Sequence, residues 1–445
     1  MSGRLRSAYV GAALVVLFSV GSLAAGGPGV ASASHGSGFL AIQAPTVASP
    51  FPSCVAAGSC STPTQFLTAY DLAGPDASLA IGTGATIALI DSFGSPTIAK
   101  DLAVFDAKFG LPAPPSLKII APAGRIPRCC STSDMAGWAG ETTLDVEWAH
   151  AMAPGARILL VETPVSETEG TAGFPQIVTA LNYVLDHKLA SVISMSFGAT
   201  EATIPSSAWK WLHQPIIKAV ADHVTLVASS GDTGATDYQL NMTDLYTHSV
   251  VGCPASDPGV TAVGGTYLKL GSDGTRIAAD VLWNDLAGAG GGGLSRVWGR
   301  PMFQNGVKAI VGTHRGLPDI SMSAAVQPGG VVFYHSYPGD LVGWDVVGGT
   351  SESAPLFAGL VARAVGLRAG HTPVGFINSW LYAYAKNPAL GIIDVTHGRN
   401  TFAFQNSNGG SYRVIGFPAR VGYDLVSGWG TVDGWKFVQA LAKKA

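Results

Sequence analysis

The 445-residue sequence is poor in charged residues, and this shortage excludes one class of partner. Asp, Glu, Lys and Arg make up only 12% of the chain and the formal net charge is −3, so no basic face is available for nucleic acid. Beyond the N-terminus no apolar run approaches a membrane span, and we find no internal repeat. The Gly-rich patch 288–293 has no strand pattern before it and no Lys after it, which argues against a phosphate-binding loop. With 47% hydrophobic residues, the chain can form a globular protein with one large core or two modest ones.

Cysteine is also scarce, with five residues in the whole chain. Cys54 and Cys60 lie close together in a stretch rich in Gly, Ala and Ser, where a small bridge would hold flexible chain, so we predict a disulfide and an oxidising compartment. The neighbours Cys129 and Cys130 cannot easily bond to each other, and we expect one of them to pair with Cys253 and the other to stay a free thiol. No Cys-x-x-Cys spacing or nearby histidine supports a metal site here.

Residues 1–33 have the pattern of a secretory signal peptide. Two arginines precede an apolar run over residues 9–25, and Ala31-Ser32-Ala33 is a small-residue cleavage site. The alternative is an uncleaved membrane anchor, but the Gly and Ser content of the run and the cleavage site favour removal. We therefore expect a secreted, extracellular protein that does not stay inserted in a membrane and whose mature chain begins near Ser34.

The rest of the chain divides into an N-terminal arm and a folded domain. Residues 34–62 are rich in Gly, Ala, Ser and Pro without helical or strand period, which predicts a linker or an arm that lies along the surface. From 63 to 445, short apolar runs alternate with helical patterns, so we expect an α/β fold with a mostly parallel central sheet and helices on both faces. Active sites of such sheets lie beyond the carboxyl ends of the strands. The predicted strands are 85–90, 158–162, 192–195 and 224–228, and the predicted helices are 142–152, 175–187 and 208–222.

Ser351 is a candidate nucleophile at the start of a predicted helix. It follows Gly348 and Gly349, which allow a sharp turn, and precedes the apolar helix 356–363. At a helix start the positive end of the helix dipole would stabilise negative charge that develops beside the serine. Taken alone, such a serine is more often a helix cap. A catalytic serine also needs a base, because its hydroxyl is a weak nucleophile.

The candidate base is a glutamate, because no histidine has a suitable setting. His150 lies nine residues after Glu141, which places it on the opposite face of the same helix. Glu141 and Asp145 are four residues apart and therefore share one helix face. On a solvated face this pair would have no meaning, whereas in a buried site two carboxyl groups can take separate acid and base roles.

Asp232 is the third candidate. It stands beside two glycines, directly after the predicted strand 224–228. An Asp at this position usually stabilises a turn, but it can also point across the strand ends towards a substrate carbonyl.

Together these stretches resemble the sedolisin family, the serine-carboxyl peptidases built on a subtilisin-like fold. The resemblance runs from Pro63 to the C-terminus and keeps several motifs in order. The matching stretches are 62–65 with 69–70, 87–94, the helix that contains Glu141, 196–198, 231–232, 260–266 and the stretch around Ser351.

The resemblance implies a secreted, acid-active endopeptidase that forms an acyl-enzyme on Ser351. Glu141 would be the general base and later the general acid, Asp145 would support Glu141, and Asp232 would occupy the oxyanion hole. Ser196, Phe197 and Gly198 would hold an extended protein or peptide substrate by backbone hydrogen bonds. We expect a monomer.

This set of residues implies activity in acid. Asp232 can donate to an oxyanion only when it is protonated, while Glu141 can accept a proton only when it is ionised or shares a proton. Because both residue types have reference pKa values of about 4, activity should be greatest at low pH unless burial raises the pKa values.

The C-terminal region resembles the calcium site of the same family. The resemblance implies one structural Ca²⁺ ion, held by the side chains of Asp394 and Asp424 and by the backbone carbonyls of Val395, Arg420 and Gly422, with water completing six hard oxygen ligands.

Two features depart from the family pattern. Family members usually have a long folded propeptide, whereas about thirty residues separate the predicted signal from residue 63, too few for a domain. We expect the protein either to fold unaided or to use a helper chain. Glu352, directly after the nucleophile, is expected to point into solvent at the helix start, where an acid is favourable.

Two other functions remain as alternatives. One is a His-dependent, subtilisin-like hydrolase with Asp91 as the orienting acid. The other is a secreted binding scaffold without catalysis, and the presence of all four catalytic residues argues against it.

Overall fold

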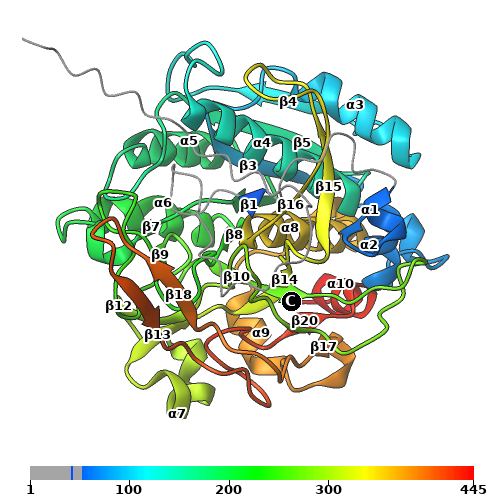
Figure 1. Ribbon diagram of the computed structural model, residues 1–445. Helices are drawn as coiled ribbons and strands as arrows, with labels where there is room; N and C mark the ends of the chain where they lie inside the picture. The colour runs from blue at the N-terminus through cyan, green and yellow to red at the C-terminus, as the bar shows by residue number, and fades with distance from the viewer. Residues whose placement is uncertain (1–41, 44–52, 445) are drawn as a thin grey trace, which may run out of the picture.

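The computed structural model describes residues 42–43 and 53–444 (Figure 1). The predicted signal peptide 1–33 and its apolar run lie outside the described residues. Within the part that is described, no helix is both long enough and apolar enough to cross a bilayer.

The centre of the molecule is an eight-stranded, mostly parallel sheet, which confirms the predicted α/β fold (Figure 1). Of the strands named in the next sentence, the first two pair with each other in antiparallel orientation. Every other pairing in this sheet is parallel. In spatial order the strands are β11 (Val281–Leu282), β10 (Thr261–Tyr267), β8 (Thr225–Ser229), β6 (Val192–Met195), β3 (Thr86–Ser92), β5 (Arg157–Thr163) and β4 (Leu117–Ile120), and β14 (Ile320–Ser323) pairs with β10.

Helices cover both faces of this sheet because its strands are apolar on both sides. Ile87 and Leu89 face a core shared with α4 (Ser133–Met152) and α8 (Thr350–Leu367). Their neighbours Ala88 and Ile90 face the opposite core. The helices of this second core are α5 (Phe174–Asp186) and α6 (Trp209–Ala221).

Smaller elements surround the central layers. A four-stranded sheet has the order β1 (Ile42–Gln43), β16 (Gly343–Gly348), β15 (Gly330–His335) and β2 (Cys60–Ser61). The two-stranded pairs are β7 (Ala199–Thr200) with β9 (Gly252–Cys253), β12 (Gly293–Gly299) with β13 (His314–Leu317), β17 (Ile392–Ile393) with β20 (Thr431–Val432), and β18 (Phe402–Gln405) with β19 (Ser411–Val414). The remaining α-helices are α1 (Ser53–Ala56), α2 (Pro63–Ala69), α3 (Ile98–Phe109), α7 (Lys308–Val311), α9 (Asn378–Tyr384) and α10 (Gly434–Ala442). Short 3-10 helices are 77–79, 201–203, 302–307, 369–371 and 388–390.

The end of the predicted linker or arm, within residues 53–61, contains α1 and β2. Cys54 and Cys60 form a disulfide, and their buried side chains pack against Val332 and Val346 of the β15–β16 hairpin. β2 also pairs with β15 in parallel. A crosslink and hydrogen bonds to a sheet edge therefore order a segment whose sequence has no periodic pattern.

The expected pairing of Cys253 is wrong. Cys129 and Cys130 are bonded to each other, and Cys253 is a buried free thiol. Cys253 belongs to the core beneath α5 and α6, whereas the neighbouring pair lies in a partly exposed loop before α4. Cys130 adopts a positive φ of 68°, which turns the chain between the two thiols.

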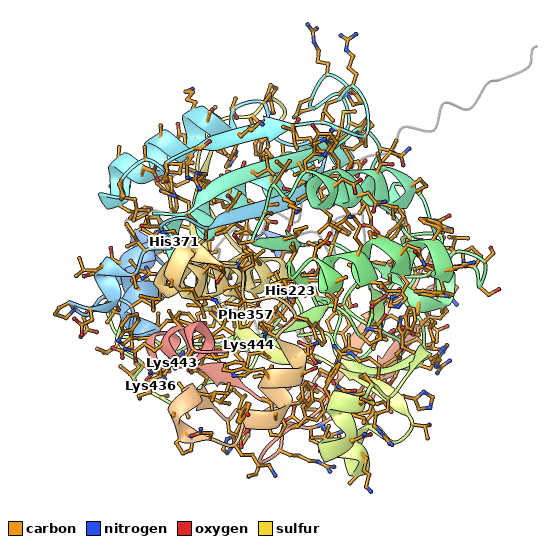
Figure 2. All side chains as sticks on the ribbon, turned by 180° about the vertical axis from the view of Figure 1, so that it is seen from behind. His223, Phe357, His371, Lys436, Lys443 and Lys444 are labelled. Carbon is orange, nitrogen blue, oxygen red and sulfur yellow. A yellow bond between two sulfur atoms is a disulfide. The ribbon has the colours of Figure 1, made fainter. Side chains whose placement is uncertain are left out.

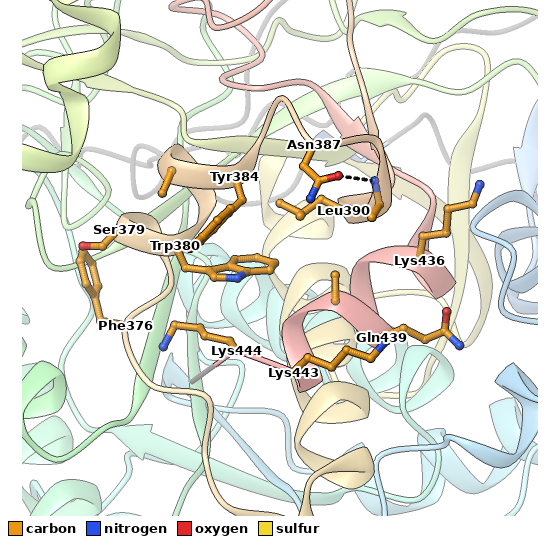
Figure 3. Close-up of a pocket in the computed structure, with 13 residues that line it drawn as sticks. Phe376, Ser379, Trp380, Tyr384, Asn387, Leu390, Lys436, Gln439, Lys443 and Lys444 are labelled. Atoms are coloured by element: carbon orange, nitrogen blue, oxygen red, sulfur yellow. Dashed lines mark hydrogen bonds between the residues drawn. The ribbon is translucent and has the colours of Figure 1, made fainter.

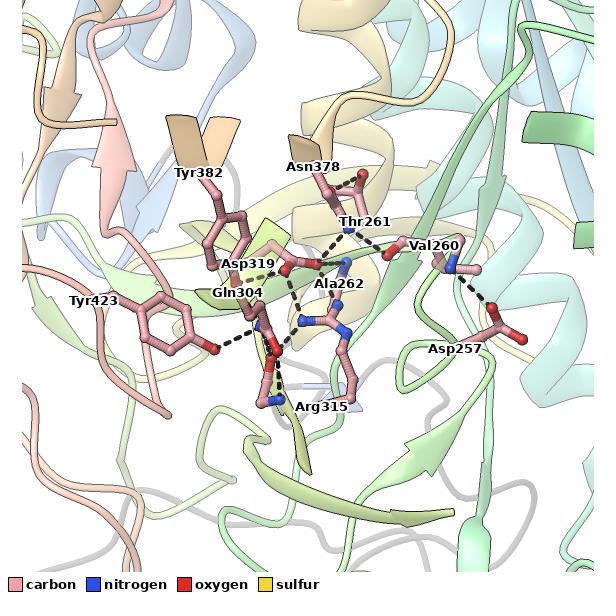
Figure 4. A network of polar contacts seen from close by, with 12 residues as sticks. Asp257, Val260, Thr261, Ala262, Gln304, Arg315, Asp319, Asn378, Tyr382 and Tyr423 are labelled. Atoms are coloured by element: carbon pink, nitrogen blue, oxygen red, sulfur yellow. Dashed lines mark hydrogen bonds and ion pairs between the residues drawn. The ribbon is translucent and has the colours of Figure 1, made fainter. Parts of the chain in front are cut away.

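A buried ion pair connects strand β10 of the central sheet with neighbouring elements (Figure 4). Arg315 donates to both carboxyl oxygens of Asp319 at 2.8 and 2.5 Å, and neither side chain is exposed. The hydroxyl of Tyr382 on α9 and the backbone N–H of Ala262 on β10 also donate to Asp319, at 2.8 and 2.9 Å. The network thus joins β13, α9 and β10 around a single carboxylate.

Helix α8 passes through the middle of the molecule and ends beside α10. Phe357 of α8 packs against Phe437 of α10, with the ring centroids 5.5 Å apart. Figure 2, seen from behind, labels Phe357 near the lysines at the end of the chain. The C-terminal helix therefore supports the helix that begins with Thr350 and Ser351.

Candidate active site

Four buried residues predicted from the sequence lie on elements that pack together. Glu141 and Asp145 are on α4, Ser351 is the second residue of α8, and Asp232 lies three residues after the end of β8. Helices α4 and α8 contact each other, and α8 also contacts β8 and β6. All four side chains are at most 3% exposed. The site therefore lies at the carboxyl ends of the parallel strands.

Local backbone geometry places Ser351 in the first turn of α8. Gly349, just after β16, has φ 112°, a conformation that side chains rarely allow. Pro355 lies inside the helix and has no N–H, so it cannot form the helical backbone hydrogen bond to the carbonyl oxygen of Ser351. The turn and the following helix thus hold the Ser351 hydroxyl near the positive end of the α8 dipole.

Ser196 contacts both Asp145 of α4 and the nucleophile Ser351 of α8. Its hydroxyl lies 2.9 Å from Asp145 Oδ1, to which it donates, and 3.2 Å from the carbonyl oxygen of Ser351. The Ser351 hydroxyl in turn lies 3.4 Å from the carbonyl oxygen of Ser196. The sequence suggested only a backbone role for Ser196, although its position directly after β6 places it at the strand ends.

Phe197 and Gly198 continue from Ser196 towards β7. The buried Phe197 ring packs between Trp138 and Phe174, at centroid distances of 6.4 and 6.5 Å. The Phe197 side chain is therefore part of the core beside the site, and any contact with substrate falls to the backbone of this stretch.

Asp232 is held by the residue before the nucleophile. The backbone N–H and the hydroxyl of Thr350 both lie 2.7 Å from Asp232 Oδ1, and the Thr350 hydroxyl accepts from the N–H of Gly231 at 3.0 Å. Asp232 Oδ2 is buried and has no hydrogen-bond partner in the described part of the chain. Burial raises the pKa of Asp232 to about 7, against the opposing effect of Thr350. In acid Asp232 is therefore a neutral acid with a hydroxyl to donate.

More carboxyl groups lie behind Asp145. Burial, and then the charge of Asp91, raises the pKa of Asp145 well above its usual range. Asp91 lies opposite Glu162 in the register of β3 and β5. Burial, and then the charge of Glu162, raises the pKa of Asp91 to about 8. Sequence reasoning missed this interaction, which the strand register creates.

The alternative role of Asp91 as the orienting acid of a histidine has no support in the geometry. Neither carboxyl oxygen of Asp91 has a hydrogen-bond partner among the described residues, so no histidine is bound to it there. His150, on the far face of α4 from Glu141, instead contacts the carbonyl oxygen of Pro112 and the carboxylate of Asp106, at 2.9 and 3.2 Å.

The expectation that Glu352 points into solvent is wrong. Its side chain is fully buried, and burial raises its pKa well above the usual range. The reason is that α8 is surrounded by protein from residue 350 to 365, so its first turn has no solvent-facing side.

The residues predicted to bind calcium lie together in one cluster of loops. The N–H of Gly422 donates to Asp394 Oδ2 at 2.7 Å, and the N–H of Arg420 donates to Asp424 Oδ2 at 2.7 Å. Val395 is buried beside Asp394. Carboxylates are hard oxygen donors of the kind that Ca²⁺ takes, and in this structure Asp394 Oδ2 and both oxygens of Asp424 accept hydrogen bonds from the loop itself.

A pocket of about 910 Å³ lies elsewhere, between α9 and α10 (Figure 3). Trp380 and Tyr384 line one side of it, and Lys443 and Lys444 lie at another. None of the candidate catalytic or calcium residues lines this pocket. The candidate chemistry therefore depends on the strand ends and not on this cavity.

Sequence comparison relates the chain to known peptidases. The profile of the subtilase family matches residues 133–381. Kumamolisin of Bacillus sp. (strain MN-32) is 33% identical over 373 residues, covering 82% of this chain and 61% of that protein. Sedolisin of Pseudomonas sp. (strain 101) is 32% identical over 383 residues, covering 83% and 59% respectively. The chain thus spans about three fifths of the length of these relatives.

Structure comparison agrees with the sequence. The solved structure of Pseudomonas sedolisin, described as a serine-carboxyl proteinase in complex with pseudo-iodotyrostatin, superposes with a TM-score of 0.68 at 29% identity. The match covers 86% of this chain and 98% of that one. The chain therefore belongs to the subtilase family and, within it, to the sedolisin family.

Proposed function

We propose that this chain is a secreted, acid-active serine-carboxyl endopeptidase that cleaves protein or peptide substrates. The observation that carries this proposal is the state of Asp232. Next to the nucleophile stands a buried carboxyl group with a pKa of about 7 and one oxygen without a partner in the described structure. Such a group can donate a hydrogen bond to an oxyanion in acid, when it holds its proton.

In the proposed mechanism, the Ser351 oxygen attacks the peptide carbonyl carbon while Glu141 accepts the hydroxyl proton. Protonated Asp232 donates to the oxyanion of the tetrahedral intermediate. When the intermediate collapses, the C–N bond breaks and Glu141 returns the proton to the departing amine. Water then attacks the acyl-enzyme by the same route and releases Ser351.

Asp145 and Ser196 are proposed to support Glu141. The two acids lie one turn apart on α4, and their charges affect each other. The hydrogen bond from Ser196 holds Asp145 in place at 2.9 Å. The backbone of 196–198 would bind an extended substrate.

The mechanism sets the direction of the pH dependence. As pH rises through about 7, Asp232 ionises, loses its proton donor and places a negative charge beside the developing oxyanion. Activity should therefore be high in acid and fall on the alkaline side.

A pH profile of protein digestion tests the catalytic proposal. We expect wild type to be most active in acid, and Ser351→Ala and Glu141→Gln to lose activity by about 10³-fold or more. Ser206→Ala, an exposed serine outside the site, is the matched control and should keep full activity. A neutral optimum without acid activity would exclude this mechanism. A folded wild type that fails to cleave denatured protein would instead support the binding scaffold.

We also propose one structural Ca²⁺ ion at Asp394, Val395, Arg420, Gly422 and Asp424. An ion that binds only the folded state, at a free concentration 100 times its Kd, adds about 3 kcal/mol to the free energy of unfolding. Chelation should therefore lower the Tm of wild type and of the control Asp71→Asn, and should leave the already reduced Tm of Asp394→Asn unchanged. An unchanged wild-type Tm on chelation would remove this site.

The location and assembly of the protein follow from the same proposal. The pattern of residues 1–33 supports export, and an extracellular setting agrees with the Cys54–Cys60 disulfide. We expect the exported protein to act as a monomer.

A further inference from the structure

The β15–β16 hairpin places a histidine and an aspartate side by side. His335 pairs with Gly343 across the two strands, and Asp345 lies two residues beyond Gly343 on the same face. Because Gly343 has no side chain, the aspartate can approach His335 diagonally. His335 Nε2 lies 2.7 Å from Asp345 Oδ2, and both side chains are buried.

The turn of the hairpin adds a second carboxylate. Asp340 is exposed, yet one of its oxygens, a ring nitrogen of His335 and an oxygen of Asp345 all lie within 4.8 Å of one another. The cluster is therefore buried on one side and open to solvent at Asp340.

The histidine ring is fixed and incompletely satisfied. It is stacked between Phe333 and Tyr337, at centroid distances of 5.2 and 4.7 Å. His335 Nδ1 has no hydrogen-bond partner among the described residues, although the side chain is fully buried. A buried ring nitrogen without a partner costs stability, and a bound cation nearby would change which nitrogen carries the proton.

We propose that His335, Asp340 and Asp345 bind one divalent transition-metal ion, with Zn²⁺ as the probe. An imidazole and two carboxylates are a mixed nitrogen and oxygen set, which suits Zn²⁺, whereas Ca²⁺ takes oxygen ligands. Three protein ligands leave a fourth tetrahedral position for water. The site is separate from the calcium loops and contains none of the catalytic residues.

The position of the cluster gives a bound ion a structural effect. A Cβ atom at Gly140 of α4 would lie only 3.0 Å from the Tyr337 hydroxyl, so the hairpin turn rests closely on this glycine. Gly140 directly precedes Glu141. An ion that ties Asp340 to His335 would therefore hold the turn against the helix that presents the proposed base.

Zinc binding to the full chain, measured by calorimetry at pH 7 in excess Ca²⁺, tests this site. Neutral pH is used because the imidazole must be deprotonated to bind the metal. We expect one Zn²⁺ ion per chain in wild type, and binding weakened about tenfold or more in Asp340→Asn and His335→Gln. Asp71→Asn, which changes another exposed acid away from the cluster, is the matched control and should bind like wild type.

The test does not depend on proteolysis, because it measures the metal directly. Asp340 is exposed, so Asp340→Asn should fold even if the change at buried His335 prevents folding. Visible absorption of bound Co²⁺ should be strong for wild type and lost in Asp340→Asn. Absence of Zn²⁺ binding, or equal affinity in wild type and Asp340→Asn, would overturn the proposal.

Discussion

Buried carboxyl groups in two parts of this protein, around Asp319 and at the candidate active site, have opposite surroundings. Each oxygen of Asp319 accepts at least two hydrogen bonds, and Arg315 balances its charge (Figure 4). Asp232 has one oxygen without a partner, and Asp91 has two. No basic side chain forms an ion pair with Asp91, Asp145 or Asp232 in the described structure.

The difference separates a structural from a chemical use of the same residue type. A buried carboxylate with a cation and a full set of donors fixes neighbouring strands and helices. A buried carboxyl group without a cation keeps its proton to higher pH, and that proton can take part in a reaction. The second arrangement costs stability, which the surrounding core must offset.

The largest expected effect comes from removing the cation of the structural pair. Arg315→Met should lower the free energy of unfolding by about 3–5 kcal/mol, because Asp319 would stay buried without a counter-charge. Arg315→Lys, which keeps the charge but not the two parallel hydrogen bonds, should lose less. Urea unfolding at pH 7 measures both values. Unchanged stability of Arg315→Met would mean that this ion pair does not fasten the sheet.

Removing the proton donor of the site should slow catalysis. Asp232→Ala should lower kcat by about 10²–10³-fold, the usual cost of losing one oxyanion donor. Asp232→Asn keeps an N–H donor that does not titrate, so its activity should persist above pH 7, where wild type declines. The pH profiles of kcat for the three proteins make the comparison. If kcat of Asp232→Asn declined above pH 7 in the same way as kcat of wild type, the proposed role of Asp232 would be contradicted.

The third expected effect, on the stability of the folded protein, has the opposite sign. The pKa of Asp91 is about 8 in the folded protein, so its burial penalty appears as pH rises above about 4, where the unfolded chain ionises. Asp91→Asn should therefore be more stable than wild type by up to about 4 kcal/mol at pH 7, and equal to it near pH 4. Urea unfolding at the two pH values tests this. If Asp91→Asn were less stable than wild type by the same amount at both pH values, Asp91 would have an unrecognised partner.

The parts of the site that depend on local pattern could be predicted from the sequence. A separation of four residues places Glu141 and Asp145 on one helix face, and two glycines before Ser351 indicate a sharp turn into a helix. The apolar run before Asp232 predicts a strand end. Each of these features depends on a few neighbouring residues, and the alternating strands and helices were enough to predict the mostly parallel sheet.

The parts that depend on distant packing could not be predicted. Glu352 was expected in solvent because a helix start usually has an exposed side, but here other elements enclose the whole turn. The closeness of Asp91 and Glu162 is set by the register of two strands far apart in the sequence. Cys130 bonds to its neighbour through a positive φ that its residue type does not indicate.

The packing of Phe357 against Phe437 has a practical consequence for protein engineering. Phe357 lies less than two helical turns after Ser351, and Phe437 and Leu441 are fully buried near the end of the chain. Trimming the last dozen or so residues would uncover the support of the nucleophile's helix, although it would delete no residue of the catalytic set. An affinity tag at this end should therefore be added as an extension that leaves α10 intact, and never as a replacement for it.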